Sequence, residues 1–197
     1  MANVRRVLEI VTPIETERLR LRPFVAEDLD AITPMQASTD VTRYLYWGPR
    51  TREEARAALE LNAGRTVLHE EGDILSLAVV LRDGGELVGD VVFFLRSVQH
   101  RQGEIGFIFD PRHQGNGYAT EAARVLLRLG FHDLDLHRIF GRLDARNGAS
   151  ARVLERLGMR REAHLVENEM VKGEWTDELV YALLRREWER GGVAPSV

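Results

Sequence analysis

Apolar side chains recur in two patterns along the chain, and the period-two pattern predicts the strands. Residues 18–24 (RLRLRPF) alternate polar and apolar positions, as a half-buried strand does, and Pro23 limits its pairing. Residues 74–82 and 86–96 are apolar runs that flank Asp83, Gly84 and Gly85. Small residues of this kind accept the backbone angles of a tight reversal, so these runs predict a hairpin.

Three further segments complete the predicted sheet. Residues 102–110 (QGEIGFIFD) and 137–145 (HRIFGRLDA) each have the composition of a strand. The last part of the chain reads as two strands separated by Lys172 and Gly173. We therefore expect a mixed sheet of about seven strands.

Between these strands, apolar residues recur at the spacing of helices. Leu29 and Ile32 predict a short helix that Pro34 ends or kinks, and Thr51 with Glu54 forms a capping box for a second helix. Residues 147–158 predict a helix that ends at a Gly158 cap. One more helix carries a stripe of small and apolar residues that we expect to face the sheet: Ala119, Ala122, Ala123, Leu126 and Gly130.

The order of these elements predicts an α/β domain in which hairpins precede one β-loop-α-β crossover. We expect about four helices and a single domain over residues 1–197, with a core of about residues 14–190 and a frayed tail from Ala194. The N-terminal residues are too charged for a signal peptide or a membrane span. A cytoplasmic protein is the default expectation.

Composition narrows the chemistry. The 197 residues are 44% hydrophobic and 29% charged, with a formal net charge of −4, so nucleic-acid binding gains no support. Cysteine is absent, which excludes disulfides, thiolate nucleophiles and cysteine-ligated metals. The six histidines lack the spacing of a metal site, so we expect no metal.

The stretch PRHQGNGYATEA, residues 111–122, places two glycines where a strand gives way to a helix. Amides at a helix start have no intrahelical partners and lie at the positive end of the helix dipole, so bare backbone there suits a phosphate. Arg112 adds a guanidinium, and Gln114 and Asn116 add neutral donors. An anion site is therefore predicted.

Other interpretations of this loop were weighed. A dinucleotide-binding loop needs a third glycine where Thr120 stands, and it follows a βα unit rather than hairpins. A Walker loop needs a lysine that the segment lacks. A tight turn without a ligand remains an alternative.

Arg112-x-x-Gly115-x-Gly117 resembles the acetyl-CoA pyrophosphate loop of the GNAT N-acetyltransferases. Residues 15–24 (ETERLRLRPF), 147–159 (NGASARVLERLGM) and 173–188 resemble other parts of that superfamily, in its branch related to the ribosomal-protein N-terminal acetyltransferases. The resemblance implies a mostly antiparallel sheet whose fourth and fifth strands splay to hold acetyl-CoA. It implies these cofactor-binding residues: Phe107, Ile108, Phe109, Arg112, Gln114, Gly115, Asn116, Gly117, Tyr118, Ala119, Asn147 and Ser150.

The resemblance also implies direct transfer of acetyl to a primary amine in a ternary complex. The amine must lose a proton to attack, and Glu104 and Glu167 are the candidate bases. A backbone N–H of residues 107–109 can stabilise the charge that develops on the thioester oxygen. Many relatives use a tyrosine to protonate the leaving thiolate, but Leu154 occupies that place here, so Ser150 becomes the candidate donor.

Two of these residues also have purely structural interpretations. Asn147 can bind pantetheine amides or cap the helix that it begins, and the hydroxyl of Ser150 can serve as a first-turn cap. Residues 43–49 (RYLYWGP) fall where the family sets acceptor specificity, so Tyr44, Tyr46 and Trp47 can line the amine pocket. The acceptor is either a protein N-terminus or a small amine, and the family often forms homodimers. The alternative function is a noncatalytic acyl-CoA-binding module.

Overall fold

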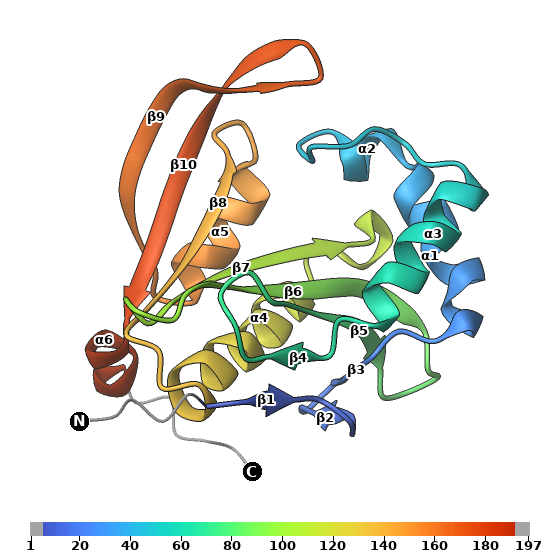
Figure 1. The fold of residues 1–197 in the computed structure, drawn as a ribbon. Helices are drawn as coiled ribbons and strands as arrows, with labels where there is room; N and C mark the ends of the chain where they lie inside the picture. Colours follow the sequence, from blue (N-terminus) through green and yellow to red (C-terminus); the bar gives the residue numbers. More distant parts are fainter. Residues whose placement is uncertain (1–5, 192–197) are drawn as a thin grey trace.

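The computed structural model describes residues 6–191 and is built around a sheet of eight strands in the order β2-β3-β5-β6-β7-β8-β10-β9 (Figure 1). The strands of this sheet are β2 (Ile14–Glu15), β3 (Leu19–Arg22), β5 (Ile74–Leu81), β6 (Leu87–Ser97), β7 (Gln102–Phe109), β8 (Arg138–Asp144), β9 (Arg160–Val171) and β10 (Glu174–Leu184). A separate short pair joins β1 (Leu8–Glu9) to β4 (Val67–Leu68).

Neighbouring strands of the large sheet run antiparallel, with one exception. β7 and β8 are parallel because the chain crosses between them through α4 (Tyr118–Arg128). The hairpin turn at Gly84 and Gly85 has positive φ at both glycines (84° and 70°), as the predicted tight reversal requires. The turn at Lys172 and Gly173 also has positive φ at both residues, and it joins β9 to β10.

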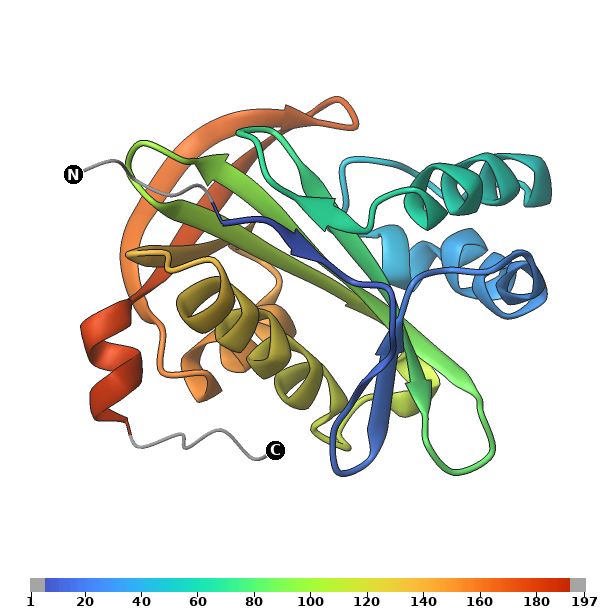
Figure 2. The same ribbon diagram turned by 60° about the horizontal axis from the view of Figure 1, so that its bottom comes forward.

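Helices cover both faces of the sheet. α4 and α5 (Gly148–Arg156) lie on one face, and α1 (Leu29–Ala37) with α3 (Arg52–Ala63) lies on the other (Figure 2). The remaining helical segments are η1 (Ala26–Asp28), α2 (Thr39–Thr42), η2 (Pro111–His113), the π-helical turn η3 (Leu129–Asp133) and α6 (Arg185–Arg190). None of the helices within residues 6–191 has the length and apolarity needed to cross a bilayer.

The small-residue stripe of α4 packs directly on the sheet, as predicted. Ala122, Ala123 and Leu126 are fully buried. A Cβ at Gly130 would lie 2.5 Å from the Cδ1 atom of Ile139 and 3.0 Å from the Phe93 ring, so only a glycine fits there. This contact fixes the position of α4, and therefore of the loop that begins it.

The α/β class, the crossover and the central hairpin are confirmed, while the counts need correction. The large sheet has eight strands rather than about seven, because the two-residue strand β2 is too short to give an alternating signal. Residues 6–191 contain six α-helices rather than about four. The two additional helices, α2 and α6, are too short to give a clear helical pattern. Pro34 does not end its helix, because α1 continues to Ala37. The expected fraying from Ala194 lies outside the described residues.

Candidate active site

The two central strands part after a short shared stretch. β7 and β8 pair only at Gln102–Arg138, Gly103–Ile139 and Glu104–Phe140. Beyond Glu104, β7 keeps its ladder with β6 but has no partner on its β8 side, while β8 continues against β10. Residues 105–109 therefore present one edge of backbone N–H and C=O groups to an opening, where an extended ligand can pair with them.

The glycine loop lies at the end of this open edge. Gly115 and Gly117 have φ of 84° and 81°, a conformation that other residues rarely adopt. No atom lies within 4 Å of a Cβ built at Gly115, so the space beside it is open. Gly117 is the N-cap of α4 and has no side chain to satisfy the first amides of the helix. These features fit a diphosphate.

Thr120 strengthens that fit and was not anticipated as a ligand. Its Oγ1 is buried at the first turn of α4 and has no hydrogen-bond partner among the described residues. A buried hydroxyl without a partner is unfavourable, so a ligand oxygen at the helix start would stabilise it. The sequence placed Thr120 only as the residue that breaks the dinucleotide pattern.

Arg18 holds the loop from the neighbouring strand β3. Its Nη1 donates to the carbonyl of Asn116 at 2.9 Å, and its guanidinium forms an ion pair with Glu121 at 2.6 Å. The same guanidinium lies 4.9 Å above the centre of the Tyr118 ring. Tyr118 packs against the core at the entry to α4.

Arg112 is exposed but already engaged. Its Nη2 lies 2.7 Å from Oδ2 of the buried Asp110, and its side chain is 70% exposed. Hydrogen bonds from Arg112 hold the pKa of Asp110 below its usual range. To contact a phosphate, the guanidinium must either keep its hydrogen bonds to Asp110 or break them.

The start of α5 faces the same opening from β8. Asn147 is the N-cap, and its Oδ1 accepts from the Ser150 backbone N–H at 3.1 Å, so the structural interpretation of Asn147 is confirmed. Ser150 is partly exposed, and its hydroxyl makes no hydrogen bond within the described chain. Leu154 is buried in the main core, with Cδ1 3.0 Å from the Cβ position of Gly141.

Glu104 points to the face of the sheet opposite α4, beside Phe94 in the β6–β7 ladder. This orientation could not be decided from the sequence. Glu104 is only 7% exposed and accepts from Arg96 Nε at 2.7 Å and from Arg142 Nε at 3.2 Å. Arg142 also contacts Glu178 at 3.2 Å, and burial raises the pKa of Glu178.

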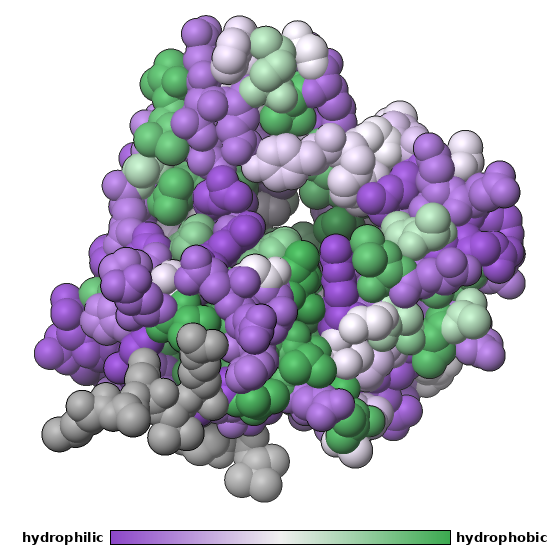
Figure 3. All heavy atoms as spheres, in the orientation of Figure 1, coloured by the Kyte–Doolittle hydropathy of each residue, from purple (hydrophilic) through white to green (hydrophobic). Residues whose placement is uncertain are grey.

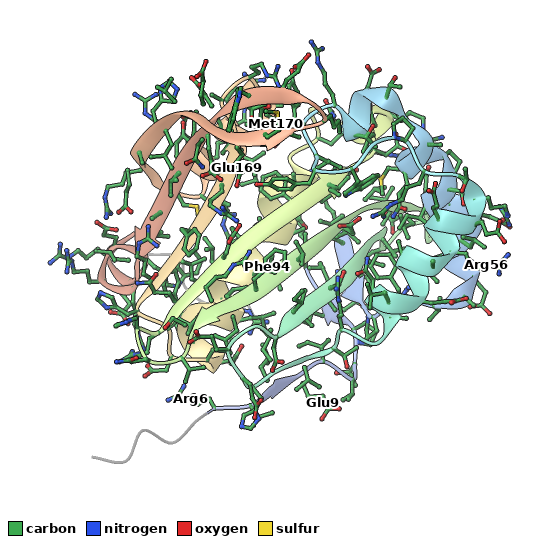
Figure 4. The ribbon with its side chains drawn as sticks, turned by 45° about the horizontal axis from the view of Figure 1, so that its top comes forward. Arg6, Glu9, Arg56, Phe94, Glu169 and Met170 are labelled. Carbon is green, nitrogen blue, oxygen red and sulfur yellow. The ribbon has the colours of Figure 1, made fainter. Side chains whose placement is uncertain are left out.

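The other predicted base lies elsewhere. Glu167 is exposed on β9 with φ of 47°, and its backbone N–H donates to Asp177 at 2.9 Å. Glu167 is not part of the ion-pair group that Glu104 forms with Arg142. Glu169 is part of it, since its carboxylate lies 3.7 Å from Arg142. Figure 4 shows Glu169 on the arch of β9, while Phe94 lies on the sheet below.

The β9–β10 tip reaches across to the helices. Tyr46 Oη donates to Glu169 Oε2 at 2.6 Å, and Lys172 Nζ donates to the carbonyl of Thr42 at 2.5 Å. The space-filling view shows an opening beneath this contact, between the tip and the α1–α3 side (Figure 3). We call the space between the sheet, α1–α3 and the β9–β10 tip the cleft. Tyr46 lies at its rim, in the segment expected to contact the acceptor.

Asp90 is a further acid on the cleft face of β6, paired in the ladders with Ala78 and Ile108. It is 8% exposed and makes no side-chain hydrogen bond or ion pair within residues 6–191. Burial raises its pKa to about 7, against the opposing charge of Arg50. Its pattern position, polar within a buried strand, was the signal that could have identified it.

The arrangement combines a glycine loop at the start of α4, the open edge of β7, and an acidic cleft on the face of the sheet opposite α4. It can hold a phosphate-bearing extended ligand against β7 and a cationic group in the cleft. No group of three or more potential metal ligands occurs in the part of the chain that the structure describes.

Comparisons with known proteins agree with this geometry. Residues 18–160 match the acetyltransferase (GNAT) domain family. YnaD of Bacillus subtilis, an uncharacterised N-acetyltransferase, is 36% identical over 175 residues, which cover 89% of this chain and 98% of YnaD. The spermidine N(1)-acetyltransferase of Escherichia coli is 25% identical over 86% of this chain and 88% of its own length.

A solved structure shows the same fold. The GNAT-family acetyltransferase of Bacillus anthracis superposes with a TM-score of 0.80 at 34% identity, over 89% of this chain and all of that one.

Proposed function

Because the chain belongs to the GNAT family and is an acetyl-CoA-dependent acetyltransferase, we propose that it transfers acetyl to a primary amine bound in the cleft formed by the sheet, α1–α3 and the β9–β10 tip. The parting of β7 from β8 next to the glycine loop carries this proposal. Acetyl-CoA supplies an activated thioester. In the proposal, residues 115–120 hold its diphosphate and the open edge of residues 107–109 pairs with its pantetheine.

The amine attacks the thioester carbon directly, and no covalent enzyme intermediate forms. A backbone N–H of residues 107–109 stabilises the developing oxyanion. Of the two candidate bases, we favour Glu104, which pairs with Arg96 and Arg142, over the exposed Glu167. Since two guanidinium groups already occupy the Glu104 carboxylate, we propose that it receives the amine proton through water.

The leaving thiolate needs a proton, and Ser150 is the proposed donor. Its hydroxyl is partly exposed at the start of α5, whereas Leu154 is buried and has no proton to give. Asn147 fixes the first turn of α5 and so places Ser150.

A small amine and a flexible protein N-terminus both fit a cleft of this kind. The spermidine acetyltransferase relative supports the small amine. Acids crowd the cleft, which favours a protonated acceptor in either case. The alternative, a noncatalytic acyl-CoA-binding module, is supported only by Leu154, which stands where many relatives have the tyrosine that protonates the thiolate.

The test is release of free CoA from acetyl-CoA with a panel of peptides and small amines, and mass spectrometry of the acetylated product. We expect transfer to at least one primary amine. Tight binding of acetyl-CoA with no acetylated product across the panel would contradict the proposal and favour the module.

A further inference from the structure

The carboxylates of the cleft outnumber the cations that neutralise them. The acids on this side are Asp90, Glu104, Glu169 and Glu178, and the arginines are Arg50, Arg96 and Arg142. Arg142 contacts three of the acids, and Arg96 contacts Glu104. Asp90 is the acid that is left without a contact among the described residues.

Arg50 is the candidate partner whose charge acts on the Asp90 carboxyl, but its guanidinium contacts other groups. Its guanidinium lies 3.8 Å above the Trp47 ring, and its Nη1 donates to Gln36 Oε1 at 3.0 Å. It forms no ion pair with Asp90 within the 4.0 Å that would define one. Asp90 therefore lies nine-tenths buried, and no group of the described chain contacts its charged form, so a ligand that supplies a cation would stabilise that form.

The position of Asp90 relates it to the reacting centre. Ile108, its ladder partner, belongs to the strand segment whose far edge is open for the thioester. Neighbouring strands lie about 4.8 Å apart, so Asp90 and the ligand on the far edge of β7 are separated by roughly two strand spacings, about 10 Å. Val92 and Ile108 beside it are half-buried, whereas Ala78 is fully buried in the apolar cluster under α1 and α3, so Asp90 lies at the border between the cleft and this packed side.

We propose that Asp90 binds a second protonated nitrogen of the acceptor, so that the preferred acceptors are extended diamines or polyamines whose other amine reaches the thioester. This inference rests on the proposed function and names its substrate class. The remaining carboxylates are already paired with arginines, so they do not compete for that nitrogen.

The groups that face Asp90 from each packed element support a charge role. Its ladder neighbours Ala78 on β5 and Ile108 on β7 are apolar, and Arg50, which donates to Gln36 of α1, is the one charged group that influences the carboxyl in the described chain. A bound ammonium would lower the pKa of Asp90 from about 7. Binding near neutral pH would then release protons.

The experiment compares α,ω-diamines, from putrescine to hexamethylenediamine, with monoamines of the same chain length. We expect kcat/KM per amino group for the best diamine to exceed that of its monoamine by about tenfold or more, and we expect this ratio to fall to about one in Asp90→Asn. Asp83→Asn makes the same change on an exposed turn and should keep the wild-type ratio. An unchanged ratio in Asp90→Asn, or a wild-type ratio near one at every length, would overturn the inference.

Calorimetry separates this inference from the proposed function. Putrescine is titrated into the protein with CoA present, in two buffers of different ionisation enthalpy. Binding with proton release that Asp90→Asn abolishes would support the inference even if no amine were acetylated. Binding that is equal in both proteins would refute it, and acetylation of monoamines alone would leave the proposed function intact.

Discussion

Replacing Arg142 with methionine should destabilise the fold in a pH-dependent way. Arg142 is the shared partner of the buried Glu104 and Glu178. Removing one partner of a buried ion pair costs about 3–5 kcal/mol. Because the Arg142 side chain is 32% exposed and Glu104 keeps Arg96, we expect a smaller loss of about 2–3 kcal/mol in the free energy of unfolding near neutral pH.

The pH dependence follows from Glu178. Burial raises its pKa, and Arg142 opposes that rise, so the variant raises it further. A carboxyl whose folded pKa exceeds its unfolded value adds stability at low pH, and that stability is lost as the pH rises through the folded pKa. The loss caused by Arg142→Met should therefore be greater at about pH 8 than at about pH 5, by about 1 kcal/mol.

Urea denaturation at the two pH values measures this difference. Arg56→Met is the matched control, since Arg56 is exposed on α3 and points away from the cleft (Figure 4), and it should change stability by less than about 0.5 kcal/mol at either pH. If Arg142→Met has the same cost at both pH values, or no cost, Arg142 does not neutralise these carboxylates.

Three further predictions test the loop, the donor and the packing. Gly117→Trp should abolish CoA binding in calorimetry, because the side chain fills the space for the phosphate at a positive φ; Gly84→Trp, at a similar φ in an exposed turn with open space, should bind CoA normally. Ser150→Ala should lower kcat by about tenfold or more with little change in CoA affinity, and equal turnover would remove the serine from the mechanism. Gly130→Val should lower the free energy of unfolding by about 1–3 kcal/mol, since its Cβ would overlap Ile139, and an unchanged thermal midpoint would contradict the packing described.

Patterns of a few adjacent residues predicted most of the fold. The Thr51 and Glu54 capping box forms as predicted, with the Thr51 N–H donating to Glu54 at 2.8 Å. Gly158 has the positive φ of a helix cap, at 83°. Such features depend on a few adjacent residues, so a single sequence contains them. The two-residue strands depend on distant partners, and no local pattern predicts them.

The candidate site likewise has local features, which the sequence predicts, and contacts between distant residues, which it does not. The glycine loop and the capping role of Asn147 are local, and both were predictable. The pairing of Arg142 with Glu104 and Glu178 joins three strands, and neither spacing nor composition reveals it. The pattern marks Asp90 as a polar residue in a buried strand, but only the packed structure shows that its side chain makes no hydrogen bond or ion pair within the described residues.

The contacts of Tyr46 with Glu169 and of Lys172 with Thr42 close a ring above the sheet. In the proposed reaction, an acceptor that enters beneath this crossing would have to enter end-on. A linear amine would then pass more readily than a folded protein, which could offer only a loose terminus.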